Sequence, residues 1–379
     1  MAGQIIKRGE RKWLLRVDLG RDEAGKRQRM NKTVHGTKKE AQKILNEMLG
    51  DKDRGTLITE SRESLNSYLD RWLETAAKPK VREDTFKGYA TKLRIYIRPP
   101  LGDKQLQRIS ALDIQKVYAD MQARDLSANT VHHAHKILRN ALQQAVKWRL
   151  IPSNPADLVE LPKLEHNEML AMNQEEAQRF LSAAKTNRWH ALFALMLSTG
   201  LRPSEALALK WEDIDFQRHV IRVQRKLTRV KGGFLFEPPK TKRSRRVVDF
   251  PVNLTDVLLE HQARQAELGE IDPDLSLVFA GETGQPAHER NILKRHYRPL
   301  LKAADLPLSL RLYDLRHTHA TLLLLAGVHP KVVSERLGHS SISITLDTYS
   351  HVLPTMQKES AAKLNDMLFT EGVSERVYN

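Results

Sequence analysis

The chain opens with short runs in which apolar and polar residues alternate, a pattern typical of half-buried β-strands. Turn residues separate these runs, which lie at residues 4–8, 12–19 and 28–34. A helical period follows: Thr37 and Glu40 have the spacing of a capping box, and we expect the helix to end at Gly50. Residues 1–60 are therefore predicted to form three strands and one helix that covers one face of their sheet.

Residues 61–165 carry only helical periodicity. The first apolar stripe consists of Leu65, Tyr68, Leu69, Trp72 and Leu73. A second stripe is expected to end at Pro99, because proline interrupts a helix. Further helices are predicted to begin at Ser110 and at either Ser127 or Asn129. The segment is therefore predicted to be an all-helical module with its aromatic residues in the core.

The last module, residues 166–379, follows a proline-containing linker and mixes both periods. A fully apolar helix is expected to end at Gly200, and Pro203 suits the first turn of the next helix. Strand-like runs lie at residues 220–223 and 247–250. We therefore predict a multidomain protein with a small α+β domain, an all-α domain and a mainly α domain with a small β-sheet.

Charge adds a class of partner to this picture. The formal net charge is +16 over 379 residues, and the first 165 residues carry +12 of it, which favours a polyanionic partner. The chain has no cysteine, which excludes disulfides, thiolate metal sites and cysteine nucleophiles and fits a reducing cytoplasm. No run approaches 18 apolar residues, so we expect neither a membrane span nor a signal peptide.

One face of the predicted N-terminal sheet is basic. The residues expected on the face opposite the helix are Lys12, Arg16, Arg27 and Arg29. A sheet of this size can enter a DNA groove, so we predict that these residues bind DNA. The alternative interpretation is a basic face that is merely solvated.

Five segments of the last module carry residues suited to phosphate chemistry. They are STGLRPSEAL at 198–207, PKTKRSRRVV at 239–248, YDLRHTHAT at 313–321, LGHS at 337–340 and TLDTYSH at 345–351. Alone, the first offers no more than a surface arginine. The second is predicted to be a basic β-hairpin on which Lys242, Arg243 and Arg245 contact DNA, although it could be a nonspecific patch.

Together, and in this order, the five segments resemble the tyrosine recombinase family, and most of all the integrases of phages and conjugative transposons. The resemblance implies that Tyr349 attacks a DNA phosphodiester and that Arg202 and Arg316 stabilise the charged transition state. It implies Lys240 as the acid that protonates the leaving 5′-oxygen and His339 as a donor to phosphate or a guide for Tyr349. The 3′-phosphotyrosine link conserves the bond energy, so no cofactor or metal is expected.

The second arginine box departs from the family at one position. Tyr313 stands where the family usually has histidine, and a phenol is a poor proton acceptor near neutral pH. The group that accepts the proton of Tyr349 is therefore left open. His317 and His319 are nearby in sequence, but we expect both to point away from Tyr313 and Arg316 and to be packed or capping residues. Tyr313 is an unsuitable nucleophile because it precedes the second arginine.

The resemblance also implies partners. It implies double-stranded DNA attachment sites, read as arm sites by the first module and as core sites by the others, and a homotetramer with accessory DNA-bending or excision factors. We expect a cytoplasmic enzyme that joins the nucleoid when bound to DNA. Two other interpretations remain at this point: a DNA-binding regulator with an inactive recombinase domain, and a type IB topoisomerase.

Overall fold

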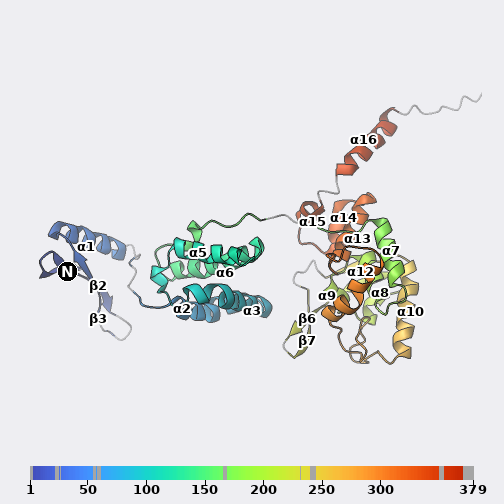
Figure 1. Cartoon of the computed structure of the whole chain (residues 1–379), viewed down its shortest axis with the longest axis horizontal. Helices are drawn as coiled ribbons and strands as arrows, with labels where there is room; N and C mark the ends of the chain where they lie inside the picture. The colour runs from blue at the N-terminus through green and yellow to red at the C-terminus, as the bar shows by residue number, and fades with distance from the viewer. Residues whose placement is uncertain are drawn as a thin grey trace, which may run out of the picture. The chain divides into compact units, whose positions relative to one another are not determined.

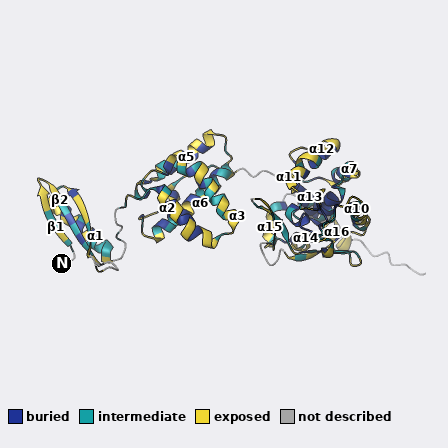
Figure 2. Cartoon of the chain, turned by 90° about the horizontal axis from the view of Figure 1, so that it is seen from below, coloured by how far each residue is buried: buried dark blue, intermediate teal, exposed yellow. Residues whose placement is uncertain are grey.

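The computed structural model describes residues 3–21, 25, 27–53, 57, 61–164, 169–230, 232–239, 245–349 and 354–369. The chain divides into two compact units, Met1–His166 and Asn167–Asn379 (Figure 1). Within each part, the buried positions gather on the inner faces of the elements and the exposed positions on their outer faces (Figure 2). Among the described helices, none is long and apolar enough to cross a membrane.

The first unit begins with a three-stranded antiparallel sheet in the order β1-β2-β3. The strands are β1 (Gly3–Gly9), β2 (Lys12–Arg21) and β3 (Arg27–His35), and helix α1 (Lys38–Asp53) packs on one face. Leu15 and Val17 alternate toward that helix and are fully buried. The predicted end at Gly50 is wrong: α1 continues to Asp53, because a glycine inside a helix lowers its stability without ending it.

The rest of this unit is helical, as predicted. Its helices are α2 (Leu65–Trp72), α3 (Glu83–Lys92), α4 (Arg98–Leu101), α5 (Ala111–Ala123) and α6 (Ala128–Lys147). The predicted stripe on α2 is buried, Ser110 caps α5 in a capping box, and Ser127 rather than Asn129 caps α6. The predicted end at Pro99 is wrong. A π-helical turn links α3 to α4, and Pro99 lies in the first turn of α4, where its missing N–H costs nothing.

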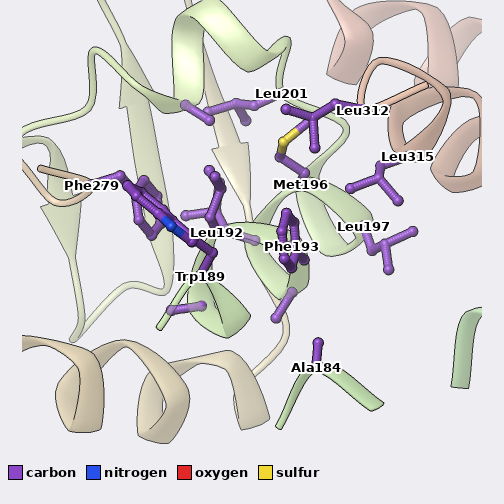
Figure 3. Close-up of a cluster of buried hydrophobic side chains, with 14 of the residues drawn as sticks. Ala184, Trp189, Leu192, Phe193, Met196, Leu197, Leu201, Phe279, Leu312 and Leu315 are labelled. Carbon is purple, nitrogen blue, oxygen red and sulfur yellow. The ribbon is translucent and has the colours of Figure 1, made fainter. Parts of the chain in front are cut away.

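The second unit is mainly helical. Its helices are α7 (Gln174–Ala184), α8 (His190–Thr199), α9 (Pro203–Ala206), α10 (Asn253–Glu267), α11 (Glu289–Ile292), α12 (Arg298–Ala303), α13 (Asp314–Leu325), α14 (Pro330–Leu337), α15 (Ile342–Tyr349) and α16 (Pro354–Phe369). Helix α8 is apolar on all sides because it lies in the middle of the core. Its Phe193 and Met196 lie among Leu312, Leu315 and Phe279 from distant segments (Figure 3).

Two small sheets complete this unit. One contains β4 (Ile214–Asp215), β5 (Val220–Val223) and β8 (Arg246–Asp249) in the order β4-β5-β8; the other is a hairpin of β6 (Lys226–Val230) and β7 (Gly233–Glu237). Residues 240–244 of the predicted basic hairpin lie outside the described residues. The described end of that segment belongs to β8, which pairs with β5, and the hairpin of β6 and β7 lies upstream of it.

Candidate active site

A left-handed turn places the first arginine. Gly200 ends α8 at a φ of 66°, and a Cβ there would lie 2.6 Å from the His319 ring, so the position requires glycine. Arg202 then becomes the cap residue of α9. Its guanidinium donates to Glu205 Oε1 at 2.8 Å, and its backbone N–H donates to Oε2 at 3.0 Å. Two short helices and one carboxylate therefore fix this side chain.

Glu205 also joins the first box to the sheet. Arg246 at the start of β8 donates to Glu205 Oε2 at 3.0 Å, and its Nε donates to the Arg336 carbonyl at 2.6 Å. Burial alone would raise the pKa of Glu205, but Arg246 and Arg202 hold it below its ordinary value. The carboxylate therefore stays charged at neutral pH and is shared by two arginines.

A pocket of about 490 Å³ opens beside this pair. It is lined by Arg202, Ser204, Glu205, Lys226, Pro239, Tyr313, Gly338, His339, Ser340 and Ile344. His339 follows the left-handed Gly338 at the end of α14, and its Nδ1 lies 2.8 Å from the Thr345 hydroxyl. Residues of the first four sequence segments thus meet around one cavity that presents an arginine, a phenol and an imidazole.

Arg316 lies in the interior behind this pocket and does not line it. Its side chain is only 1% exposed, and it donates to the carbonyls of Gly200 and Leu337 at 2.7 and 2.6 Å. Burial, with a further contribution from Arg202, lowers the pKa of Arg316 to about 10, so it remains protonated at neutral pH. The second arginine thus ties the first box to the end of α14 and brings a positive charge into the interior.

Tyr349 is also buried, and it is bonded to a histidine. The tyrosine is 1% exposed, and its hydroxyl lies 2.7 Å from Nδ1 of His317. Burial raises the pKa of Tyr349 and lowers the pKa of His317 to about 4, so both groups are neutral at neutral pH. Tyr313, which lines the pocket, packs against this pair, with its ring centroid 5.2 Å from that of His317.

The prediction that His317 points away from Tyr313 is wrong. Residues four apart on a helix share a face, so the start of α13 places the two rings together. The prediction for His319 is confirmed: it is 4% exposed, and its Nδ1 lies 2.8 Å from the Leu197 carbonyl.

The structure describes only some of the basic residues that were predicted from sequence for catalysis and DNA binding. Lys240, Lys242 and Arg243 lie outside the described residues, while Arg245 is exposed just before β8. The other four predicted residues lie along the face of the N-terminal sheet opposite α1, spread from one end of the β2–β3 pair to the other: Lys12, Arg16, Arg27 and Arg29. Whether these residues bind DNA stays a prediction.

Sequence reasoning missed Glu205, Arg246, Lys226 and His317. Glu205 could have been found from its position three residues after Arg202, the spacing of a cap. Lys226 lines the pocket, although its ammonium pairs with Glu237 at 2.7 Å. No local signal marks Arg246, whose partner Glu205 is 41 positions away.

Comparisons with known proteins show which family the chain resembles. Residues 170–356 match the phage integrase family, and residues 64–122 match the N-terminal SAM-like domain of phage integrases. A tyrosine recombinase XerC-like protein of Caldanaerobacter subterraneus is 33% identical, and the match covers 96% of this chain and 98% of the relative. The ICEBs1 integrase of Bacillus subtilis is 29% identical, with 75% of this chain and 79% of the relative covered.

The fold is also similar to solved structures. The Tn1549 transposon integrase in complex with a circular intermediate DNA superposes with a TM-score of 0.69 at 23% identity, covering 78% of this chain and 98% of that one.

Proposed function

The chain belongs to the phage integrase family of tyrosine recombinases, and we propose that it recombines DNA at specific sites through a covalent bond to Tyr349. Enzymes of this family break and rejoin DNA, and the observation that carries the assignment is the convergence of the sequence segments on one pocket. Arg202 and His339 line that pocket, while Arg316 and Tyr349 lie in the interior behind it. The pocket that a phosphodiester can enter thus presents the positive charge of Arg202, and the buried Arg316 and Tyr349 lie behind it.

The proposed reaction has two matched steps. The oxygen of Tyr349 bonds to phosphorus as the bond to the 5′-oxygen breaks, and Lys240 supplies the proton that the leaving oxygen needs. Arg202 stabilises the additional negative charge of the transition state from the pocket wall, and Arg316 does so from behind. The reverse attack by a 5′-hydroxyl on the phosphotyrosine rejoins the strand and releases the tyrosine.

The N-terminal sheet supports a second DNA contact. Its open face carries Lys12 and Arg29, both exposed, in a layout that suits arm-type sites away from the point of cleavage. We expect a chain that lacks residues 1–60 to lose binding to arm sites while it still binds the core site. Equal recombination of full attachment sites by the shortened chain would contradict this role.

The last helix supports assembly on DNA as a tetramer. Its exposed apolar residues are Leu364, Met367, Leu368 and Phe369. An apolar pocket of about 550 Å³, lined in part by Phe250, Leu323 and Val332, offers a complementary surface on the same domain. Transfer of α16 to this pocket on a neighbouring copy would link the copies on two synapsed sites. Accessory DNA-bending or excision factors belong to the same proposal.

One pair of assays separates the proposed function from its alternatives. The full chain should recombine two plasmid-borne attachment sites, and Tyr349→Phe should bind these sites equally well without recombining them. A regulator would bind DNA without recombination, while a topoisomerase would relax supercoiled plasmid that lacks attachment sites. Either of those results from the unmodified chain would overturn the proposal.

A further inference from the structure

The buried hydroxyl of Tyr349 has an imidazole as its hydrogen-bond partner. His317 Nδ1 lies 2.7 Å from this oxygen, and the two ring centroids are 5.8 Å apart. His317 is on α13, one residue after Arg316, while Tyr349 ends α15, so the contact joins two segments 32 positions apart. A proton acceptor for a phenol must lie within hydrogen-bond reach of its oxygen, and this distance meets that requirement.

The position that usually supplies an imidazole cannot fill this role here. Tyr313 occupies it, and a phenol with an ordinary pKa near 10 does not readily accept a proton at neutral pH. His339 is the other imidazole of the site, and its Nδ1 is directed to Thr345 at 2.8 Å. His317 is therefore the imidazole already on the atom that must lose a proton.

We propose that His317 is the proton acceptor for Tyr349 in DNA cleavage, a role that rests on the proposed function of Tyr349 as the nucleophile. As the oxygen–phosphorus bond forms, the O–H bond of Tyr349 breaks and its proton moves to Nδ1 of His317. The bond from phosphorus to the 5′-oxygen breaks in the same step, and that oxygen takes a proton from the general acid. In rejoining, the imidazolium returns its proton to the departing tyrosine.

The surroundings of His317 determine when the proton moves. Asp314, Arg316 and Arg311 act on its charge from its own segment, and His339 also interacts with it electrostatically. Its ring packs against the rings of Tyr313 and Tyr349. Burial keeps His317 neutral, and in the tautomer whose proton is on Nε2 its Nδ1 accepts the proton. The negative charge of an incoming phosphate favours the imidazolium, and therefore transfer is coupled to attack rather than completed beforehand.

Tyr313 connects this pair to the pocket. Its side chain is 36% exposed, lines the pocket and packs against His317, whereas Tyr349 is 1% exposed. His317 is therefore in contact with a residue of the pocket wall while it is bonded to the oxygen of Tyr349.

The test compares cleavage rates of a nicked duplex that carries the end of the mobile element, a substrate on which the covalent adduct accumulates. In His317→Asn, the amide places an oxygen near Nδ1 that accepts a hydrogen bond but not a proton. We expect adduct formation to slow by about 10²- to 10⁴-fold with little change in DNA binding. Site-specific 3-fluorotyrosine at position 349, whose phenol is more acidic, should restore much more rate to this variant than it adds to the unmodified chain.

His319→Asn is the matched control, because it changes another buried histidine of α13 that is bonded to a backbone carbonyl and not to Tyr349. His317→Gln repeats the comparison, so that the result does not depend on the folding of one variant. A His317→Asn rate equal to or above that of the unmodified chain would overturn the inference, as would equal acceleration of both chains by fluorination. An adduct that persists in Tyr349→Phe would instead overturn the proposed nucleophile.

Discussion

The pocket wall and the interior behind it divide residues that the sequence places in a single set. Arg202 has a side chain that is 28% exposed and lines the cavity, whereas Arg316 is 1% exposed and bonds two backbone carbonyls. Tyr313 is likewise on the wall, and Tyr349 is inside. Residues that belong to the same family motif can therefore differ in structural role. Those on the pocket wall can contact a phosphate, while those in the interior also stabilise the domain.

Substitutions of the two arginines should have the largest effects and should differ in their effect on stability. Arg202→Ala should slow cleavage by a factor that corresponds to about 3 kcal/mol or more, and it should destabilise the domain less than Arg316→Ala, because Arg246 still pairs with the buried Glu205. Arg316→Ala should slow cleavage as much and also destabilise the domain by about 1–3 kcal/mol per carbonyl left without a donor. Suicide-substrate kinetics and thermal unfolding measure the two effects, and equal stability of both variants would contradict the distinction.

A fall in pH should destabilise the domain, because two of its buried histidines are held neutral in the folded state. Burial lowers the pKa of His317 and of His319 to about 4, below the unfolded value of about 6.5. Because the folded-state pKa is depressed, the stability that these groups contribute is present above pH 6.5 and is lost as the pH falls toward 4. Each contributes on the order of 3 kcal/mol at most.

Unfolding by denaturant from pH 7 to pH 4 measures this loss. The His319→Asn variant should show a shallower decrease in the free energy of unfolding than the unmodified chain. An identical slope for the two chains would show that His319 is not held neutral by its surroundings.

Substitution of Tyr313 should have the smallest effect on the cleavage rate, and it tests what this residue of the pocket wall contributes. If its hydroxyl donates to a phosphate oxygen, Tyr313→Phe should lose about 1–3 kcal/mol of transition-state stabilisation. Tyr313→His should remain active, because imidazole also donates, and its cleavage rate should gain a dependence between about pH 6 and 7. Wild-type cleavage rates in Tyr313→Phe would make Tyr313 a covering residue only.

Local features of the fold were predictable from sequence because they depend on residues three or four positions apart. The caps at Thr37 and Ser110 each depend on a side chain that reaches the backbone three residues on. The ends at Gly50 and Pro99 were wrong because glycine and proline alter helix stability without fixing where a helix stops. The same local argument, applied correctly, would have placed His317 beside Tyr313.

Long-range features of the site were not predictable in this way. The order of the five segments predicted Arg202, His339 and Tyr349 as site residues, but the burial of Tyr349 depends on the packing of α15 against α13 and α14. The ion pair of Arg246 with Glu205 and the bond of His317 to Tyr349 join residues 41 and 32 positions apart. No period or motif in one stretch of sequence encodes such pairings.

The most direct test of Tyr349 as the nucleophile is to identify the atom that bonds to DNA. A nicked duplex with the end of the element is incubated with the full chain, the protein is digested, and the DNA-linked peptide is sequenced by mass spectrometry. The account predicts a single adduct on Tyr349 through a 3′-phosphate, with a free 5′-hydroxyl on the released strand. An adduct on Tyr313, a 5′-phosphate linkage, or cleavage without any adduct would contradict it.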